Sequence, residues 1–453
     1  MPEKVISLAE QIETFVSGDG ASHDLLVKLL RDLHPADIAE VMEELSETAT
    51  LAVFAALEPE VASEVLDEAE SEVTQFLIEE VPDQRLADIL DEMPMDDAAR
   101  LLGDLDEDYA ETLIDLMSPE EAEDVRGLLA YPEGTAGRLM TESFVRLRAR
   151  WTIAETLEYL RQINPDAETI AYLYVTDSEE RLAGVVPLRR LVTSQPNQTI
   201  GEIVEARIIS VQVTDEQEDV AEVVSKYDFN AVPVVDAEGR LVGIVTVDDI
   251  VDVLEEEATE DIQRLGGSEP LDQPYFSVSI LTVARKRIVW LLLLFFGGTL
   301  TSSVMSNFQN QLAEVLALSY FIPLLIGTGG NAGSQTVSTV IRALGVGEVE
   351  WSDARRVLGR ELGTGLLVGS ILGVVGFLYA LLLWRVSVPL ALVVGLALPI
   401  ICTWAKTVAS LVPLVAERFG IDPTVVSAPL ITTVVDATGL AIYFSIARLV
   451  LGL

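Results

Sequence analysis

The sequence contains very few of the residues that build disulfide frameworks and soft-metal sites. Its 453 residues include one cysteine, Cys402, and two histidines, His23 and His34. A single cysteine excludes a disulfide within one chain and a zinc site built from several cysteines. Because Cys402 lies within an apolar stretch, we expect it to pack in a core.

Basic residues are scarce in the first two thirds of the chain. Lys and Arg number 6 against 36 Asp and Glu in residues 1–130, 12 against 29 in residues 131–283, and 11 against 8 in residues 284–453. A surface this negative repels phosphate and concentrates cations, so it argues against nucleic-acid binding and favours metal ions as ligands. The alternative is an acidic surface that is only solvated, or adapted to high salt.

Targeting and catalytic signals are also missing. The first 30 residues lack the basic and apolar segments of a signal peptide, so we expect the N-terminal half to be cytoplasmic. The sequence has no Walker motif, no nucleophile elbow and no histidine placed near paired acids. We therefore expect no enzymatic activity.

Residues 1–135 repeat an apolar position about every twelve residues. Segments such as HPADIAEVMEEL and MSPEEAEDVRGLL combine an early proline or N-cap, early acids and apolar residues at helical spacing. This pattern predicts an acidic all-α solenoid of short helices. The repeated positions are Leu33, Leu45, Leu57, Ala69, Val81, Met93, Leu105 and Met117.

Two similar α/β units follow, at residues 136–200 and 201–256. The segment AYLYVTDSEERLAGVVPLRRL of the first aligns with AVPVVDAEGRLVGIVTVDDIV of the second, and both resemble cystathionine-β-synthase (CBS) domains. CBS pairs commonly bind adenine nucleotides. At Arg190 a base replaces the acid that would hold a ribose, which argues against nucleotide binding here. An acidic connecting helix is predicted within residues 257–283.

Residues 284–453 form an apolar region with few charges. Its composition predicts five transmembrane helices. Most basic residues flank the side of the N-terminus, so the positive-inside rule places the soluble domains in the cytoplasm and the C-terminus outside. The predicted spans are residues 288–306, 315–343, 358–384, 388–416 and 426–450.

One acid is expected deep in this region, at Asp436 in the last span. A carboxylate there is costly unless it faces water, an ion or a partner. Thr432, Thr433 and Gly439 are expected to share one helical stripe with it. The alternative is a protonated or internally bonded Asp436 that only packs.

The segment PLLIGTGGNAGSQTVSTV in the second span is rich in glycine. Together with Pro323, these glycines make a continuous helix costly and predict freed backbone carbonyls that face a cation; close helix packing is the alternative. Carboxylate, carbonyl and amide oxygens suit a hard cation such as Mg²⁺. A twofold axis would bring two Asp436 carboxylates to one pore.

The order of these regions resembles the MgtE family of magnesium channels over essentially the whole chain. The motifs that carry the resemblance are YDFNAVPVVDAEGRLVGIVTVDDIVDVLEEEATEDI, GTGGNAGSQ, and IDPTVVSAPL with TTVVDATG. The resemblance implies a multi-pass homodimer in the lipid of the cell (inner) membrane. It also implies inward Mg²⁺ movement, a connecting helix that acts as a plug, and closure when cytosolic Mg²⁺ binds acidic sensor domains.

The same resemblance implies residues for metal binding, for the pore lining and for nucleotide binding. For metal they are Asp436 in the pore and Glu64, Asp96, Glu216, Glu218, Asp228, Asp249, Asp252, Glu257, Glu260, Asp261 and Asp422. For the pore lining they are Gly327, Gly329, Gly330, Asn331, Gln335, Thr336, Ala428, Thr432 and Thr433. For ATP at the CBS pair they are Tyr172, Arg189 and Phe229.

Two residues depart from the family pattern. Arg100 stands where an acid is expected, which removes a ligand and predicts a weaker contact between the solenoid and the CBS pair. Ala428 stands where an asparagine is expected, which alters the inner shell of the pore.

Two other functions stay open on the sequence. An intramembrane acid also suits a transporter coupled to H⁺ or Na⁺. A solenoid with a concave surface suits a membrane-anchored Mg²⁺ sensor that acts on a protein partner.

Overall fold

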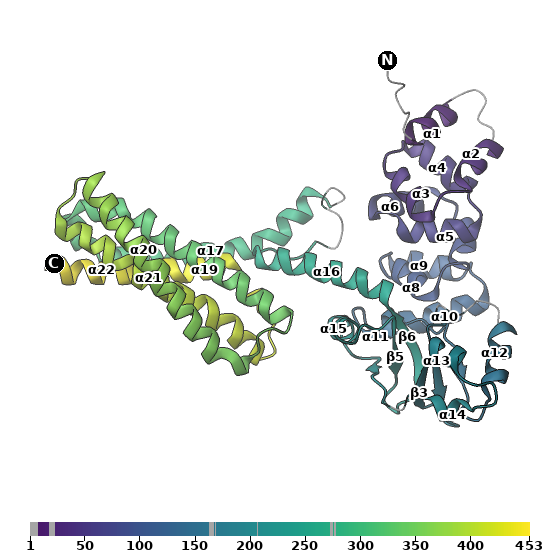
Figure 1. Ribbon diagram of the computed structural model, residues 1–453. Helices are drawn as coiled ribbons and strands as arrows, with labels where there is room; N and C mark the ends of the chain where they lie inside the picture. The colour runs from purple at the N-terminus through teal and green to yellow at the C-terminus, as the bar shows by residue number, and fades with distance from the viewer. Residues whose placement is uncertain are drawn as a thin grey trace, which may run out of the picture. The chain divides into compact units, whose positions relative to one another are not determined.

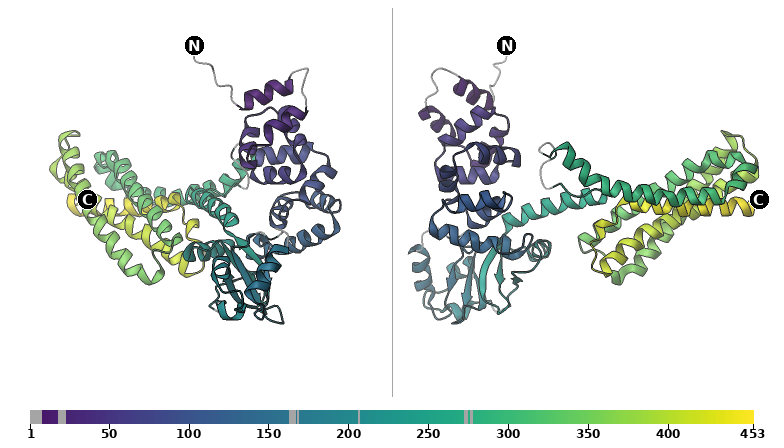
Figure 2. Two further views of the ribbon diagram at one scale, coloured as in Figure 1. Left: turned by 45° about the vertical axis from the view of Figure 1, so that its right-hand side comes forward. Right: turned by 180° about the vertical axis from the view of Figure 1, so that it is seen from behind.

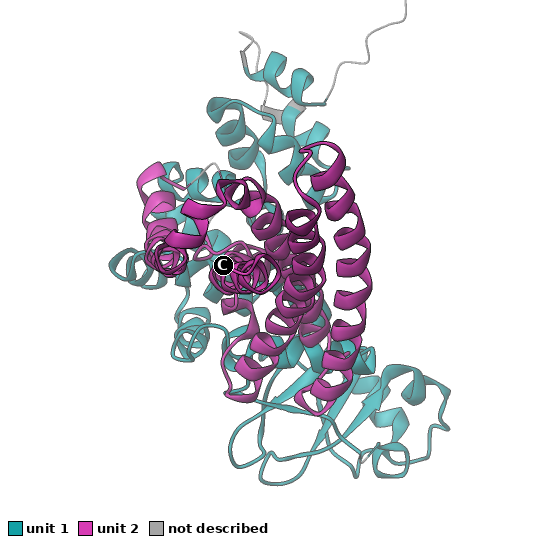
Figure 3. Cartoon of the chain, turned by 90° about the vertical axis from the view of Figure 1, so that its left-hand side faces the viewer, with its two compact units in different colours: residues 1–257 teal, residues 258–453 magenta. Residues whose placement is uncertain are grey.

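The computed structural model describes residues 8–17, 23–162, 167, 169–205, 207–271, 275 and 278–453. The chain divides into two compact units, residues 1–257 and residues 258–453 (Figure 3).

The first part of unit 1 is a stack of short helices (Figure 1). Proline occupies the first turn of three of them, where its missing N–H is not needed, and alternate helices such as α3 and α5 pack together. The stack confirms the predicted short helices. They are α1 (Leu8–Ser17), α2 (His23–Leu30), α3 (Pro35–Glu43), α4 (Glu47–Ala56), α5 (Pro59–Glu68), α6 (Ser71–Glu80), α7 (Asp83–Leu90), α8 (Met95–Gly103), α9 (Glu107–Ile114) and α10 (Pro119–Leu129).

The second part of unit 1 consists of two α/β repeats with the same sheet topology (Figure 2). In each three-stranded sheet the first strand pairs parallel with the second, and the second pairs antiparallel with the third. This confirms the tandem α/β prediction. The elements are α11 (Ala136–Leu139), β1 (Arg146–Leu147), α12 (Ile153–Gln162), β2 (Tyr172–Thr176), β3 (Leu182–Pro187), α13 (Leu188–Thr193), α14 (Ile200–Ile203), β4 (Val211–Gln212), α15 (Gln217–Tyr227), β5 (Ala231–Val235) and β6 (Leu241–Thr246).

Helix α16 (Val247–Leu265) differs in extent from the predicted connecting helix. It begins directly after β6, ten residues before the predicted start, because no helix-breaking residue intervenes. It ends at a Gly-Gly pair, and Gly267 adopts a positive φ of 76° that favours glycine. The acidic helix is therefore an extension of the second repeat.

Unit 2 is helical. Helices α17, α20, α21 and α22 are long and apolar enough to cross a membrane. Helix α19 has 24 residues but does not meet the same hydropathy criterion, so the fifth span remains a prediction. The elements are α17 (Ile280–Asn307), α18 (Gln309–Glu314), the 3₁₀ turn η1 (Leu316–Phe321), α19 (Ile322–Gly345), η2 (Trp351–Asp353), α20 (Ala354–Leu382), α21 (Val388–Arg418), η3 (Pro423–Val425) and α22 (Ala428–Leu451).

The predicted break in the glycine-rich span is wrong. Helix α19 is continuous from Ile322 to Gly345, with Pro323 in its first turn, where no amide donor is lost. The glycines allow close packing instead, because a Cβ at Gly329 would lie 2.7 Å from Ile401 Cγ2. A Cβ at Gly333 would lie 3.1 Å from Ile431 Cγ2. Close approach of α21 and α22 explains this run of glycines.

Candidate functional site

The Asp436 carboxylate lies where α22 meets α19. A Cβ at Gly330 would lie 3.3 Å from Thr432 Cγ2 and 3.9 Å from Asp436 Oδ1. Asp436 is half-buried, and no hydrogen bond or ion pair reaches its carboxylate from the residues that the structure describes. The glycine at position 330 thus leaves room beside a carboxylate that is free to accept an ion or its water.

The predicted pore-lining residues of α19 divide between two faces. Gly327, Asn331 and Gln335 are exposed at a spacing of four residues, so they form one stripe along the helix. Gly329 and Gly330 are buried against α21 and α22. No described residue covers the amides of this exposed stripe. If α19 crosses the membrane as predicted, these amides need water or a partner.

The threonines of α22 face different neighbours. Thr432 contacts Gly330, whereas a Cβ at Gly297 of α17 would lie 2.8 Å from Thr433 Cγ2. Both hydroxyls donate to the Pro429 carbonyl, at 2.8 and 2.9 Å. Because α22 is continuous from Ala428 to Leu451, Thr432, Thr433 and Gly439 lie within about one turn of Asp436, as predicted. Gly439 faces Ile401 of α21, so the members of this stripe meet different neighbours.

Ala428 is the first residue of α22 and is half-buried. The neighbouring Ser427 is fully buried as the N-cap residue, and its hydroxyl oxygen makes no hydrogen bond to any described residue. The N-terminal end of α22 therefore carries a small apolar side chain beside a hydroxyl that still has capacity to bind water.

The sequence analysis did not identify a second acid that is enclosed among the long apolar helices of unit 2. Glu361 of α20 lies 3.4 Å from Lys406 Nζ of α21, and their side chains are 17% and 12% exposed. Thr336 of α19 is buried beside them, so this predicted pore-lining residue bonds to other helices instead. Glu361 falls inside the predicted span 358–384, and Lys406 falls inside the predicted span 388–416. One acid and one base in neighbouring apolar spans are the sequence signal for this ion pair.

In unit 1, carboxylates gather around Arg100 on α8. Its guanidinium lies 2.6 Å from Asp67 of α5, 2.8 Å from Asp97 of α8 and 3.6 Å from Asp252 of α16. Arg100 therefore links the helical stack to the second repeat. From the sequence, a base at this position predicted a weaker contact between these two parts. Of the predicted metal ligands nearby, Asp96 is buried on α8 and Glu64 is exposed on α5.

Two carboxylates around Arg100, those of Asp67 and Asp97, have raised pKa values. Burial raises the pKa of Asp67 to about 7, the Asp97 carboxylate raises it too, and Arg100 lowers it. Burial also raises the pKa of Asp97, against the effect of Arg100. Three carboxylates surround one guanidinium, so negative charge is in excess when all three are ionised, which favours a further cation.

Asp249, at the start of α16, joins the same charged region. Its Oδ2 accepts a hydrogen bond of 2.7 Å from the Thr246 hydroxyl. Burial raises the pKa of Asp249 to about 7, with the Thr246 hydrogen bond lowering it and the carboxylates of Asp97 and Asp248 raising it. Asp249 and Asp97 are thus close enough to influence each other's charge.

The remaining predicted ligands of unit 1 are dispersed around α15 and α16. Glu257 Oε1 accepts a hydrogen bond of 2.7 Å from Gln217 Nε2. Glu216 is the N-cap residue of α15, Glu218 lies in its first turn, and Asp228 ends the helix with a positive φ of 53°. All three are exposed.

In unit 2, Arg264 bridges two of the predicted ligands. It forms an ion pair with Glu260, and its Nη1 lies 2.8 Å from Asp422 Oδ2. Asp422 also accepts hydrogen bonds from the backbone and the hydroxyl of Thr424. Asp261 follows Glu260 on α16.

No group of three or more Asp, Glu, His or Cys is arranged to hold a metal ion within the residues that the structure describes. Arg264 instead bridges the predicted ligands Glu260 and Asp422, and Arg100 pairs with the predicted ligand Asp252. The donor chemistry suits a hard cation with its water, because all the clustered donors are oxygens.

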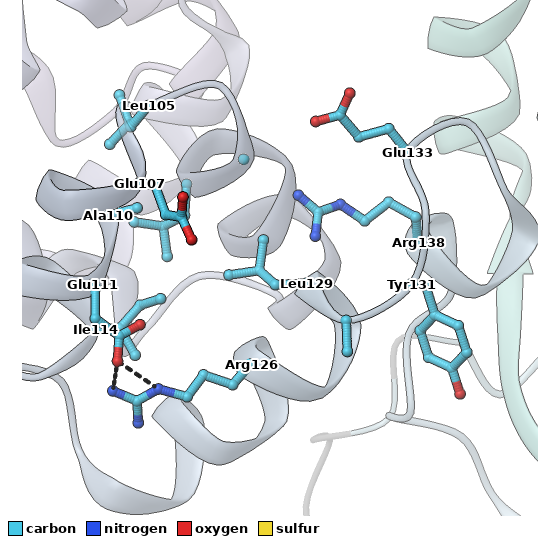
Figure 4. Close-up of a pocket in the computed structure, with 13 residues that line it drawn as sticks. Leu105, Glu107, Ala110, Glu111, Ile114, Arg126, Leu129, Tyr131, Glu133 and Arg138 are labelled. Carbon is cyan, nitrogen blue, oxygen red and sulfur yellow. Dashed lines mark hydrogen bonds and ion pairs between the residues drawn. The ribbon is translucent and has the colours of Figure 1, made fainter.

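The described residues of unit 1 enclose cavities, including one of about 690 Å³ and one of about 400 Å³. The larger of these two is lined by α8 to α11, and Figure 4 shows Arg126 bonded to Glu111 at its edge. Arg138 extends into the same space and donates to the Ala99 carbonyl at 3.0 Å. Its mixed charges do not match a cation site.

The smaller cavity, about 400 Å³, lies between the repeats and is lined by Ala171, Asn230 and Asp248 among others. Tyr172 and Phe229, which flank it in sequence, stand edge to face at 6.2 Å. Arg190 pairs with Glu205 at 2.6 Å, and Arg189 precedes it on α13. The structure therefore brings together two of the three residues predicted for nucleotide.

Comparisons with known proteins agree with this organisation. Residues 322–446 match a family described as a divalent cation transporter, residues 33–134 match the MgtE intracellular N domain, and residues 136–197 and 200–256 match CBS domains. A magnesium transporter MgtE of Thermus thermophilus is 44% identical over 72% of this chain and 72% of its own length.

Two further relatives extend the match. A magnesium transporter MgtE of Enterococcus faecalis is 40% identical over 72% of this chain and 71% of its own. A solved structure of the soluble part of a magnesium transporter is 36% identical, with a TM-score of 0.51, and covers 55% of this chain and 98% of its own. With two family domains in the order predicted and relatives along most of its length, this chain belongs to the MgtE family of divalent cation transporters, a class of non-enzymes.

Proposed function

We propose that this protein conducts Mg²⁺ into the cytosol across the cell membrane and closes when cytosolic Mg²⁺ binds its acidic domains. The Asp436 carboxylate carries the proposal, because it is an acid on an apolar helix with no partner among the described residues. Gly330 leaves space beside it. A carboxylate in that setting is a site for a cation or its water.

The pore would lie between two copies of the chain. One carboxylate is few for a divalent ion, whereas a twofold axis supplies two. The exposed stripe of Gly327, Asn331 and Gln335 supports this arrangement, since a second copy or the ion path would cover its amides. Mg²⁺ keeps several waters, so carboxylate, amide and hydroxyl oxygens can hold it through hydrogen bonds.

Closure would depend on the charge of unit 1 and α16. Residues 1–283 carry a net charge of −47, so two such regions repel each other unless cations lie between them. Divalent ions at Asp96, Asp249 and Glu257 would favour the closed arrangement only as far as they bind it better than the open one. Helix α16 is proposed to transmit this change as the plug.

Adenine nucleotide is a second proposed ligand. The cavity of about 400 Å³ between the repeats supports it, because Tyr172 and Phe229 are next in sequence to its lining residues Ala171 and Asn230. Their aromatic rings would offer a surface on which a base can stack. Arg190 forms an ion pair with Glu205, so its positive charge is already neutralised and does not attract a phosphate. Isothermal titration of the purified protein with ATP and with adenosine tests this ligand.

The transport proposal is tested by Mg²⁺ flux into proteoliposomes. Wild type, Asp436→Ala and Asp436→Asn are compared while Mg²⁺ on the cytosolic face is varied. We expect flux in the wild type that falls as cytosolic Mg²⁺ rises, and at least a hundredfold loss in both variants. Equal flux in the variants would remove Asp436 from the pathway, and dependence on an H⁺ or Na⁺ gradient would favour a coupled transporter.

A further inference from the structure

An ion pair with a shared hydroxyl lies among three helices of unit 2. Lys406 Nζ of α21 donates to Thr336 Oγ1 of α19 at 3.0 Å, and Thr336 Oγ1 donates to Glu361 Oε2 of α20 at 3.1 Å. Lys406 also reaches Glu361 at 3.4 Å, and Thr364 donates to the same carboxylate at 3.3 Å. We call Glu361, Lys406 and Thr336 the three-helix triad.

The triad is enclosed because α20 and α21 approach closely. A Cβ at Gly365 would lie 2.8 Å from Thr403 Cα and 3.4 Å from Lys406 Cδ, so the glycine makes room for the lysine stem. The charged side chains are 12% and 17% exposed on helices that are apolar enough to cross a membrane. Buried charges in such helices are expensive and tend to mark functional positions.

The triad fixes one side of α19. Thr336 follows Gly330 by six residues, about 9 Å along the helix axis. Its hydroxyl ties α19 to α20 and α21, while Gly330 and Gly333 hold α19 against Thr432 and Ile431 of α22. These contacts together set the rotation of α19 about its axis.

That rotation decides what the exposed stripe of α19 faces. Gly327, Asn331 and Gln335 lie on the side of α19 away from its packed glycines. A small rotation would move their amides relative to Asp436, and hydrated-ion selection depends on where such oxygens stand. An ion pair is a rigid means of holding this angle, because breaking it leaves a charge unpaired in an apolar surrounding.

We propose that Glu361 and Lys406 are positioning residues for ion selection, which act through Thr336 on the stripe of α19. The inference rests on the proposed transport function and names a determinant of its selectivity. It predicts that damage to the triad changes which ions pass, as well as how many. A merely structural role would reduce the amount of active protein and leave selectivity unchanged.

The test is the Mg²⁺/Na⁺ permeability ratio, taken from reversal potentials of purified full-length protein in planar bilayers. This ratio does not depend on how many molecules are active. The variants are Glu361→Gln, Lys406→Met, the double variant and Lys406→Arg. Thr407→Val is the matched control, since among the described residues its hydroxyl donates only to the Thr403 carbonyl of its own helix.

We expect each single neutral variant to lower the ratio at least fivefold. The double variant, which leaves no unpaired charge, should lie closer to wild type than either single one, and Lys406→Arg should stay within twofold. Thr336→Val keeps both charges and tests the link if the single variants do not fold. We expect it to lower the ratio two- to threefold, whereas Thr407→Val should not.

A ratio within twofold of wild type in both single variants would overturn the inference while leaving the transport proposal intact. If they do not fold, an unchanged ratio in Thr336→Val overturns it. Wild-type protein that passes no divalent ion overturns the transport proposal and this inference together. These outcomes are distinguishable because only the last one involves the wild type.

Discussion

The two units handle charge in different ways. In unit 1 many carboxylates gather around Arg100, whose side chain is 42% exposed and lies within 4 Å of Asp67, Asp97 and Asp252. In unit 2 the triad places one carboxylate and one ammonium together, with side chains 17% and 12% exposed. Water reaches the cation of the first group, although Asp97 is only 17% exposed, whereas helix packing encloses both charges of the second.

Arg100 and Lys406 therefore have different roles. Exposed ion pairs contribute about 0–1 kcal/mol and respond to salt, so Arg100 can share its position with ions from solution. Removing one partner of a buried pair costs about 3–5 kcal/mol, so Lys406 acts as a fixed part of the fold. The acidic half is therefore suited to sensing and the apolar half to holding a geometry.

The largest expected effect comes from unpairing Glu361. Lys406→Met should lower the stability of the full-length protein by about 3 kcal/mol, since a buried carboxylate loses its partner. Its thermal unfolding in detergent, followed by tryptophan fluorescence, measures the loss. The double variant with Glu361→Gln should recover more than half. If Lys406→Met costs no more than Arg100→Met, the contrast between the units is wrong.

Glycine replacements in α19 sharpen the packing side of the comparison. Gly329→Ala should destabilise by about 1–3 kcal/mol, because its Cβ would lie 2.7 Å from Ile401 Cγ2. Gly327→Ala meets nothing within 4 Å and should stabilise by up to about 1 kcal/mol through better helix propensity. Thermal unfolding of both variants side by side measures these two changes in stability. Equal effects would contradict close packing as the reason for the glycines.

The pH dependence of unit 1 tests its uncompensated charge. The pKa of Asp67 and of Asp249 is raised to about 7, so the folded chain binds more protons than the unfolded one between about pH 4 and 7. Stability should be greatest at the acidic end and fall as pH rises through that range. With screening of these partly exposed groups, we expect Asp67 to contribute about 1 kcal/mol.

Thermal unfolding of the divalent-free protein at pH 5.5 and pH 8 measures this dependence. Asp67→Asn should flatten it and raise stability at pH 8. Stability that instead rises with pH in the wild type would show that the ion pairs with Arg100 outweigh burial.

The smallest expected effect is that of Arg100→Gln. Without Mg²⁺ it should cost less than about 1 kcal/mol, since the ion pairs are exposed. With saturating Mg²⁺ it should gain more stability than the wild type, because Asp67, Asp97 and Asp252 then depend on ions from solution. Thermal unfolding of the variant and the wild type, with and without Mg²⁺ at about 10 mM, measures how much the ion stabilises each protein.

Arg126→Gln is the matched control for this experiment. Arg126 is 41% exposed and bridges Glu111 and Asp115 at 2.7 and 2.6 Å, away from the predicted ligands. An equal Mg²⁺ response in both variants would mean that Arg100 does not occupy a place that a divalent ion can take.

Much of the fold could be predicted from the sequence because it is carried by local patterns. Helical periodicity and early prolines specify the short helices of unit 1, and the two α/β repeats follow from the likeness of AYLYV and AVPVV with their turns. Asp436 stands out because an acid in an apolar run is visible without any structure. The family follows from these motifs together.

Contacts between distant residues could not be predicted this way. Composition and periodicity are local properties, so they were enough to establish the charge division, the order of elements and the presence of Asp436. Only the tertiary structure decided that α19 is continuous, that Arg100 joins α8 to α16, and that Lys406 meets Glu361. The physical reason is that packing and ion pairing depend on which helix faces come together, and spacing along the chain does not specify that.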